Sequence, residues 1–391
     1  MIDIVVDKKN ENETIAVIEN GKIVELYESN DECKHERNEG NIYSGIIKDI
    51  IPGMQAAFVD IGTEKNSFIH VKDIIPQIDE KIITKEVPKI KDVVKTNQKI
   101  LVQVQKDSND KKGARTTTHI KLTGKYLILL PQTTIVTISQ KIEDEEEKKR
   151  LLNIVKSNLP QNMGAIVRTI AEKQEESNII AEIKELEKEW IKIYKKFEEN
   201  DNKAELLYKS PSIVEKIIID LPEEKIVSIK VNNKENYDIL KEKLKNKTIN
   251  LILEENVNLI EKYDLEKQIE KTKQRKVWLN CGGFITIDAT EALVAIDVNS
   301  GKFVGKSSLE DTIYKVNYEA TLEIVKQIRL RDIGGIIIID YIDMHKDENK
   351  EKIEKLLRET LKQDRAKTQV EGFTKLNLME LTRKHICAHN S

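Results

Sequence analysis

Two short apolar runs that end in carboxylates constrain this chain more than any other feature. The first run leads into Asp297 and Asn299, and the second leads into Asp340. Between them, apolar side chains recur every three or four positions, which is the spacing of an amphipathic helix. These apolar positions are Leu309, Ile313, Val316, Ala320, Ile324 and Ile328. The stretch 291–344 therefore predicts a strand, a long helix and a second strand.

This order of elements predicts two neighbouring parallel strands whose carboxyl ends meet at one edge of a sheet. Side chains alternate along a strand, so Asp297 and Asn299 share a face. An isolated Asp after a strand is more often a cap or a turn former, but here the pattern occurs twice. Two carboxylates with water and phosphate oxygens suit Mg²⁺ or Mn²⁺ better than a closed zinc site. Such a metal would activate water and stabilise the charge that develops on a phosphodiester.

Composition sets broad limits on the rest of the chain. Its 391 residues allow two to four domains. With 65 Lys and Arg against 68 Asp and Glu, the net charge is −3, so nucleic-acid binding would need local basic patches. Three widely spaced cysteines without a C-x-x-C pair argue against disulfides and for a reducing cytoplasm. No apolar run reaches about 18 residues, so we expect no membrane span.

Short alternating runs separated by Gly and Pro turns predict a small barrel over residues 36–120. Phe58 and Phe68 lie in this region, with Lys106, Lys112 and Arg115 nearby in the sequence. Aromatic rings beside cations on a barrel face form a stacking platform for single-stranded nucleic acid. The alternative is that both Phe side chains belong to the barrel core. The surrounding pattern favours an RNA-binding barrel of the OB class.

Residues 121–215 have a different character. We expect strands over 121–131 and 163–169, and charged helices over 143–158 and 175–200. Arg168 and Thr169 follow the second strand, where a guanidinium fork and a hydroxyl would grip a phosphate. The alternative for Arg168 is an ordinary surface salt bridge.

The N-terminal segment reads as three strands, with Asn20-Gly21 as a strong hairpin signal between the second and third. Residues 1–35 are too few for a core of their own. We therefore expect them to complete a domain with residues 216–278, where strands and helices alternate. The strands expected there include 217–219, 226–231 and 249–253.

Taken together, these segments resemble the bacterial ribonuclease E/G family over essentially the whole chain. The most specific matches are 41–62, 112–131, 167–169, 291–301, 309–344 and 379–384. The resemblance implies a magnesium-dependent endoribonuclease that cleaves single-stranded, AU-rich RNA and leaves 5′-phosphate and 3′-hydroxyl ends. It implies stimulation by a 5′-monophosphate and roles in rRNA processing and mRNA decay.

The implied fold is an α/β multidomain arrangement. An RNase H-like domain, 1–35 plus 216–278, is split by an OB-type RNA-binding barrel, 36–120, and a 5′-monophosphate sensor region, 121–215. A DNase I-like α/β catalytic domain, 279–391, follows.

The resemblance also assigns roles at the acidic cluster. Asp297 and Asp340 match the magnesium ligands, and Asn299 matches a residue that assists at the scissile phosphate. Asp343 matches no defined role, and we expect it to be structural or to support the ligands.

Other residues match RNA contacts of the family. Phe58, Phe68 and Lys112 match contacts of the barrel, and Lys367 stands where some members carry an Arg. Lys keeps the charge but loses the bidentate fork of Arg. The positions that match the 5′-phosphate pocket are Gly124, Ile128, Arg168 and Thr169.

The C-terminal segment departs from the larger members of the family, which carry a C-P-x-C pair that shares zinc between two subunits. Here Cys387 stands alone between His385 and His389. One Cys and two His at this spacing could bind a metal, but a frayed C-terminal tail is the favoured interpretation. We therefore do not expect the zinc link, and a homodimer would have to form without it. A rival interpretation is a non-catalytic RNA-binding protein that retains the fold. A DNA endonuclease is disfavoured because the barrel pattern is of the RNA type. We expect the protein to be cytoplasmic.

Overall fold

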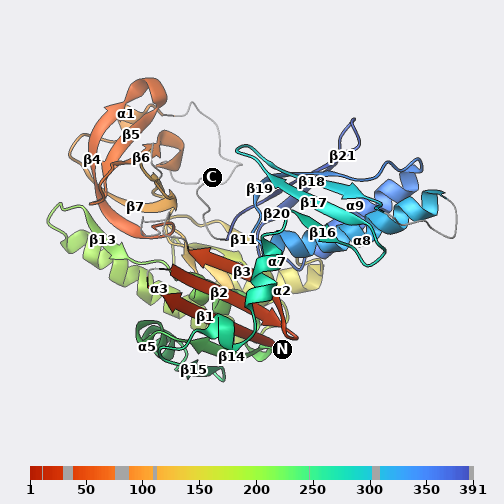
Figure 1. Ribbon diagram of the computed structural model, residues 1–391. Helices are drawn as coiled ribbons and strands as arrows, with labels where there is room; N and C mark the ends of the chain where they lie inside the picture. Colours follow the sequence, from red (N-terminus) through yellow and green to blue (C-terminus); the bar gives the residue numbers. More distant parts are fainter. Residues whose placement is uncertain are drawn as a thin grey trace. The chain divides into compact units, whose positions relative to one another are not determined.

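The computed structural model describes residues 1–10, 12–29, 38–74, 88–108, 112–245, 247–301 and 309–386. The chain divides into two compact units (Figure 1). The first unit combines residues 1–34 with 221–391, and the second is continuous from 35 to 220. The first unit is thus built from two separate pieces of the chain.

A five-stranded sheet joins those two pieces of the first unit. Its strand order is β15-β14-β1-β2-β3, and β14 lies parallel to β1. The predicted Asn20-Gly21 hairpin between β2 and β3 is confirmed, and both turn residues have positive φ. The strands are β1 (Ile2–Lys9), β2 (Asn12–Glu19), β3 (Lys22–Ser29), β14 (Ile226–Val231) and β15 (Asn250–Leu253). The helical elements of this part are η5 (Glu223–Lys225), α5 (Lys234–Lys243), α6 (Leu259–Lys262) and α7 (Glu266–Thr272).

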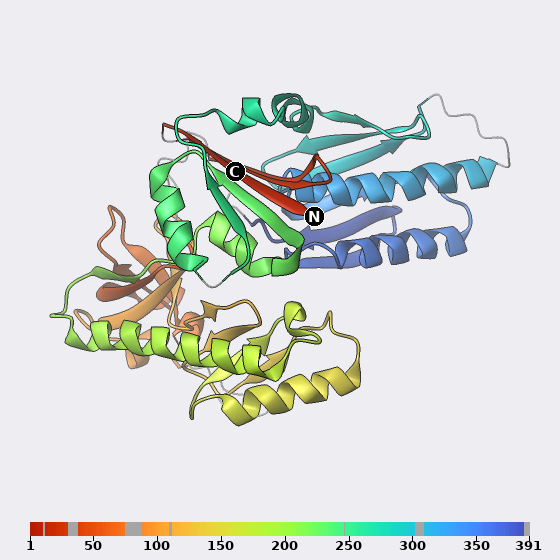
Figure 2. The same cartoon turned by 90° about the horizontal axis from the view of Figure 1, so that it is seen from below.

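A six-stranded sheet forms the rest of the first unit, in the order β16-β17-β18-β19-β21-β20. Its strands are β16 (Lys276–Trp278), β17 (Phe284–Ala289), β18 (Val294–Asn299), β19 (Gly335–Asp340), β20 (Thr368–Phe373) and β21 (Leu378–Arg383). Two helices, α8 (Leu309–Leu330) and α9 (Asp347–Leu361), pack on one face and share a single apolar core with the strands. Figure 2 shows the two helices running alongside each other.

The strand–helix–strand prediction for 291–344 is confirmed by β18, α8 and β19. Most of the predicted helical stripe is buried against the sheet, from Val316 through Ile328. Leu309 is the exception: it is 73% exposed, because it begins the helix and projects beyond the packed turns. The helices therefore cover one face of the sheet and leave the carboxylate face open.

The second unit begins with a closed barrel. Strands β4, β5, β6, β8 and β7 pair in that order, and a β4–β7 pairing closes the circle. A further strand, β13, pairs with β4, although it comes from outside residues 36–120. The strands are β4 (Ile42–Ile51), β5 (Ala56–Asp60), β6 (Ser67–His70), β7 (Lys99–Lys106), β8 (Arg115–Thr117) and β13 (Glu205–Tyr208). The helical elements are η1 (Pro52–Met54), η2 (Val71–Asp73) and α1 (Ile90–Val93).

A four-stranded sheet, in the order β11-β12-β10-β9, completes the second unit together with long helices. The strands are β9 (Leu122–Thr123), β10 (Leu127–Leu130), β11 (Val136–Ile138) and β12 (Gly164–Val167). The helical elements are α2 (Glu145–Asn158), η4 (Thr169–Ala171), α3 (Glu176–Glu199) and α4 (Ile213–Asp220). None of the helices in the described ranges is long and apolar enough to cross a membrane.

Two predicted elements of this region were wrong. The single strand over 121–131 is two strands, β9 and β10, separated by Gly124 and a bend at Lys125 and Tyr126. The strand over 217–219 is part of helix α4. The buried residues of α4, Val214, Ile217 and Ile218, have helical spacing, but a short run of Ile cannot distinguish a helix from a strand.

Candidate functional site

Asp297 and Asp340 are register partners on the adjacent parallel strands β18 and β19. Their neighbours Ile296 and Ile339 point to the opposite face and are buried in the core. Both Asp side chains are exposed on the face that the helices leave open. The apolar core thus fixes the backbone of both acids, about 5 Å apart across the sheet. The structure brings these two predicted residues together without relying on a loop.

The third predicted residue of this group, Asn299, lies on the same face of β18 as Asp297. Its side-chain amide donates a hydrogen bond to Asp297 Oδ2 at 2.5 Å. Burial raises the pKa of Asp340, and the negative charges of Asp297 and Asp343 raise it further. Asp343 is therefore close enough to affect the pair electrostatically. Like charges held this close favour a cation between them.

The donor set fits a hard cation. The described residues contain no cluster of three or more His, Cys, Asp and Glu side chains that would enclose a metal. The donors here are two carboxylates and one amide oxygen on an exposed face, so water and substrate oxygens would complete the coordination. Mg²⁺ usually binds proteins in this way, through one or two carboxylates together with water and phosphate.

Sequence reasoning missed Arg275, which lies beside this group. The Arg275 guanidinium donates to both Asp288 oxygens, at 2.5 and 2.6 Å. This bonding to Asp288 raises the pKa of Arg275, and the charge of Asp297 adds to the effect. The only signal in the sequence was a pair of adjacent cations, Arg275 just before β16 and Lys276 as its first residue.

Lys367 does not lie beside the acids. It lines a cavity of about 420 Å³ together with Thr382, Lys384 and the Gly335 end of β19. Asp340 is at the other end of that strand, about 16 Å from Gly335 along the strand. The cavity offers two ammonium groups and hydroxyl side chains, which is a chemistry suited to phosphate.

The barrel residues Phe58 and Phe68 are register partners on β5 and β6. Their ring centroids are 6.3 Å apart in an edge-to-face arrangement, and both side chains are only half-buried. Lys112 is exposed, in the segment that precedes β8. A Cβ on Gly113 would lie 2.0 Å from the Asn66 carbonyl oxygen, so only glycine allows the segment after Lys112 to approach β6 this closely. The half-buried rings agree with the stacking interpretation and not with a core role alone.

Arg115, another of the three cations near these rings in the sequence, already forms an ion pair with an acid. It is the register partner of Phe68 on β8, and its guanidinium donates to Asp73 at 3.0 Å.

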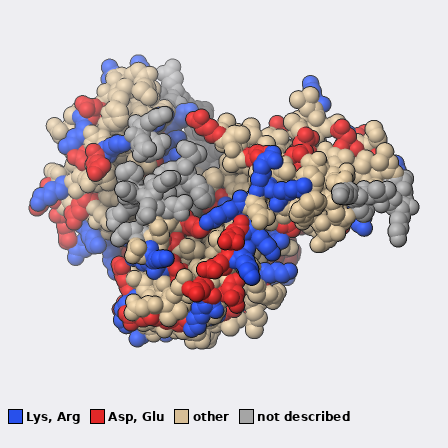
Figure 3. All heavy atoms as spheres, in the orientation of Figure 1, with Lys and Arg blue, Asp and Glu red and all other residues tan. Residues whose placement is uncertain are grey.

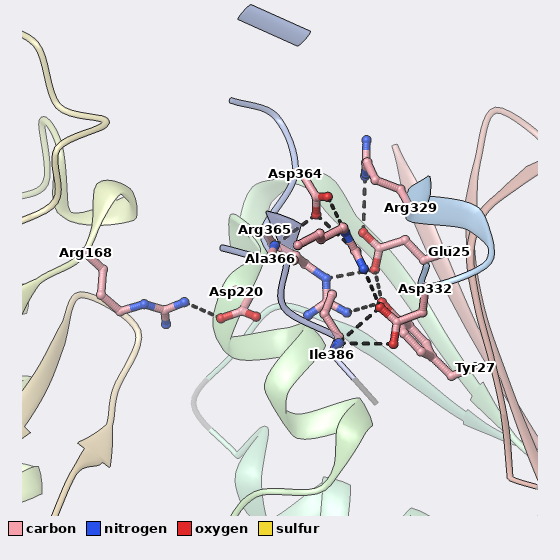
Figure 4. Close-up of polar contacts among 11 residues, drawn as sticks. Glu25, Tyr27, Arg168, Asp220, Arg329, Asp332, Asp364, Arg365, Ala366 and Ile386 are labelled. Atoms are coloured by element: carbon pink, nitrogen blue, oxygen red, sulfur yellow. Dashed lines mark hydrogen bonds and ion pairs between the residues drawn. The ribbon is translucent and has the colours of Figure 1, made fainter. Parts of the chain in front are cut away.

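Arg168 and Gly124 are brought together in the second unit. The Arg168 guanidinium donates to the carbonyl oxygens of Gly124, at 2.7 Å, and Lys125, at 3.3 Å. It also forms an ion pair with Asp220 at the end of α4 (Figure 4). Arg168 does form a salt bridge, but its side chain is only 21% exposed, so the pair is largely buried.

Thr169 and Ile128 complete the predicted phosphate group. The hydroxyls of Thr169 and Ser139 are 2.8 Å apart and share a hydrogen bond. Ile128 lies within β10 between Thr123 and Ile166, so its backbone belongs to the sheet.

Glu182 on α3 was also missed. Its carboxylate accepts hydrogen bonds from the amides of Lys125, Tyr126 and Leu127, at 2.5, 2.7 and 2.9 Å. A Cβ on Gly124 would lie 2.6 Å from this carboxylate, which explains the glycine. Burial raises the pKa of Glu182 despite these hydrogen bonds. The amides next to Gly124 are therefore already bound to an anion from the chain itself.

Residues 121–386 match the Ribonuclease E/G family, and residues 36–118 match the S1 RNA binding domain. Ribonuclease G of Escherichia coli (strain K12) is 37% identical over 361 residues, which cover 88% of this chain and 72% of that protein. Ribonuclease G of Haemophilus influenzae is 36% identical over 386 residues, covering 95% and 77%. Ribonuclease E of Synechocystis sp. is 35% identical over 356 residues, covering 88% and 52%.

This chain belongs to the ribonuclease E/G family. The predicted resemblance is confirmed, and the S1 match falls on the barrel, which confirms the predicted OB-type domain. In this family member the C-terminal residues Cys387 and His389 lie outside the described residues. The imidazole Nδ1 of His385 is 2.9 Å from the Asp332 carbonyl oxygen, in hydrogen-bonding contact.

The surface charge of this family member is mixed. On the face that Figure 3 shows, Lys and Arg side chains are interspersed with Asp and Glu. On this face, RNA would be bound by individual cationic and aromatic side chains and not by a continuous basic surface, in keeping with the net charge of −3.

Proposed function

We propose that this endoribonuclease cuts single-stranded, AU-rich RNA at the Asp297–Asp340 pair, in a magnesium-dependent reaction that a 5′-monophosphate stimulates. Family membership establishes the enzyme class, an endoribonuclease acting in RNA processing. One observation carries the assignment of the site: the two acids are register partners on parallel strands, exposed on the open face of the sheet.

Each residue of the pair has a role that follows from its chemistry. Asp297 and Asp340 would hold Mg²⁺, or Mn²⁺, which supplies charge stabilisation at the reacting phosphate when bound. Asn299 orients the Asp297 carboxylate with one N–H and has a second N–H for a phosphate oxygen. Hydrolysis joins a water oxygen to phosphorus and breaks the P–O3′ bond. The 3′-oxygen takes a proton, which leaves a 5′-phosphate and a 3′-hydroxyl.

The barrel and the cavity would hold the rest of the RNA. Phe58 and Phe68 would stack on unpaired bases, with Lys112 on the neighbouring phosphates. Lys367 would contact the RNA backbone at the far end of the sheet, as a point charge without the fork of an Arg. In this assignment the barrel supplies affinity and the acid pair supplies chemistry.

Arg168 and Thr169 would bind the 5′-monophosphate beside the backbone of Gly124 and Ile128. The close approach of Arg168 to Gly124 supports this assignment. Because Arg168 is paired with Asp220, an incoming phosphate must compete with a carboxylate for the guanidinium. The sensor would therefore discriminate by charge, since a neutral 5′-hydroxyl cannot displace Asp220.

The domain boundaries remain part of the proposal: an RNase H-like domain (1–35 plus 216–278), the barrel (36–120), the sensor (121–215) and a DNase I-like domain (279–391). The parallel pairing of β1 with β14 supports the discontinuous domain. A homodimer that forms without a zinc link is compatible with these assignments.

Removal of one charge from the acid pair tests the site. Asp297→Asn or Asp340→Asn should lower the turnover of a fluorogenic single-stranded RNA by about 1000-fold or more, with RNA binding retained. Asp347→Asn is a matched control, since Asp347 is an exposed acid in the first turn of α9. Cleavage at the unmodified rate by either test variant would show that the acids do not form the metal site.

A further inference from the structure

An exposed tryptophan stands on the edge strand β16. Trp278 is 63% exposed, and its indole packs edge-on against Phe284 of β17, with the centroids 5.4 Å apart. The ammonium group of Lys276 lies over both rings, 4.0 Å from the Trp278 centroid and 3.5 Å from the Phe284 centroid. Large aromatic side chains are usually buried in a fold of this size, so this group calls for a function.

The group lies on the same face of the sheet as the acid pair. In one row across the strands, Lys276 is the register partner of Thr286, and Thr286 of Asp297, which faces Asp340. In the next row, Trp278 is the partner of Phe284, and Phe284 of Asn299. Paired residues project their side chains to the same face. Two strand spacings place Trp278 about 10 Å from Asn299.

The chemistry around the rings favours a nucleobase over a protein surface. The neighbours on this face are polar or charged: Thr286, Asp297 and Asn299 on one side, and the cation Lys276 on the other. A protein interface would require a broader apolar surface around the aromatic pair. A single unpaired base needs only one exposed ring and a nearby cation for its phosphate.

We propose that Trp278 and Phe284 form a stacking site for one unpaired base of the RNA, next to the phosphodiester that is cut at Asp297 and Asp340. Lys276 neutralises the phosphate of that nucleotide. The site rests on the proposed function for its position relative to the cut. The stacking site would hold the RNA strand flat against the β-sheet, so that the phosphate beside the stacked base lies over Asp297 and Asp340.

Tryptophan fluorescence tests stacking separately from cleavage. The chain has two Trp residues, and the other, Trp190, is only 7% exposed. In the Asp297→Asn background, titration with a short single-stranded RNA should quench the emission. Adding Trp278→Phe should remove the quenching and keep most of the affinity, because a ring remains. Unchanged emission at saturating RNA would overturn the proposal.

Affinity measurements give a second and independent test. Trp278→Ala should weaken binding of the same RNA by about 10-fold or more, which is the usual loss of affinity when one base loses its stacking partner. Tyr237→Ala is the matched control, since Tyr237 is also covered by lysines, Lys234 and Lys241, but lies on α5. If Tyr237→Ala weakens RNA binding as much as Trp278→Ala does, the assignment is wrong.

A double-mutant cycle identifies the stacked base. An RNA that lacks one base beside the cleavage site should bind unmodified protein as weakly as intact RNA binds the Trp278→Ala protein, and the two losses should not add. If Trp278→Ala instead lowers the mass in solution and leaves RNA affinity intact, the ring belongs to an interface between copies, and the proposal is wrong. If Asp297→Asn still cuts RNA, the proposed cleavage site is wrong, and the quenching still reports on stacking.

Discussion

Two sets of carboxylates in the first unit differ in what balances their charge. Asp297 and Asp340 lie exposed beside each other, and no ion pair with Lys or Arg joins them in the described part of the chain. The second set is buried and matched by arginines: Glu25 binds Arg365 at 2.8 Å and Arg329 at 3.2 Å. In the same set, Arg383 binds Asp332 and Asp364 at 2.7 Å each, and all three side chains are 1% exposed.

The difference shows where this fold leaves room for an external charge. A buried carboxylate must have a partner within the chain, because an uncompensated charge there is costly. The exposed pair can accept its partner from solution, and the sheet already holds both acids in place. Arg168 is intermediate: its partner Asp220 comes from the chain, and in the proposed sensor a 5′-phosphate has to displace it.

Metal removal should have the largest effect on the exposed pair. Chelation with EDTA should lower cleavage by about 1000-fold or more, and added Mg²⁺ should restore it, because no ion pair among the described residues balances the charge of the two acids. Binding of RNA, and its preference for a 5′-monophosphate, should survive chelation. If cleavage continues in the presence of EDTA, the exposed acids do not depend on a cation from solution, and the proposed difference between the two sets of acids is wrong.

Glu25→Gln should disrupt the ion pairs of the buried carboxylates. It leaves Arg365 and Arg329 without their counter-charge, so the first unit should lose about 3 kcal/mol or more of stability in urea unfolding at neutral pH. Glu28→Gln is the control on the same strand, where an exposed pair with Lys273 should contribute at most about 1 kcal/mol.

The effect of Glu25→Gln should also depend on pH. Burial raises the pKa of Glu25, but the charges of Arg365 and Arg329 outweigh it, and the pKa lies below its ordinary value. Its contribution to stability is therefore complete above the pKa of the unfolded chain and disappears as the pH falls through the lower, folded value. The difference between unmodified protein and variant should shrink in acid, and a difference that grows would contradict this assignment.

Arg168→Ala should have a smaller effect. The variant should cut 5′-monophosphate and 5′-hydroxyl RNA at equal rates, a loss of preference of about 10-fold, because the charged hydrogen bonds to the phosphate are gone. Arg150→Ala is the matched control, since Arg150 pairs with Glu147 within α2 of the same unit. A preference that persists without Arg168 would place the sensor elsewhere.

The acid pair could be predicted from the sequence because its determinants are local. Strand alternation places Asp297 and Asn299 on one face, and the helical spacing of 309–328 implies parallel neighbours. The partners of Arg168 could not be predicted in this way. Asp220 and Glu182 reach the 124–168 region through tertiary packing, from α4 and α3, and no spacing rule links them to it. The position of Trp278 near Asn299 could not be predicted either, because it depends on the register of three strands and not on distance in the sequence.

The pairing of β1 with β14 has a consequence for the order of folding. Ile2 is the register partner of Ile226, so β1 can pair with β2 early, but its pairing with β14 must wait until the whole second unit has emerged from the ribosome. Until then, β1 presents an unpaired apolar edge of the kind that promotes aggregation. The second unit is continuous and can fold during this interval. The first strand to be synthesised thus obtains its second partner strand only after the whole second unit has been made.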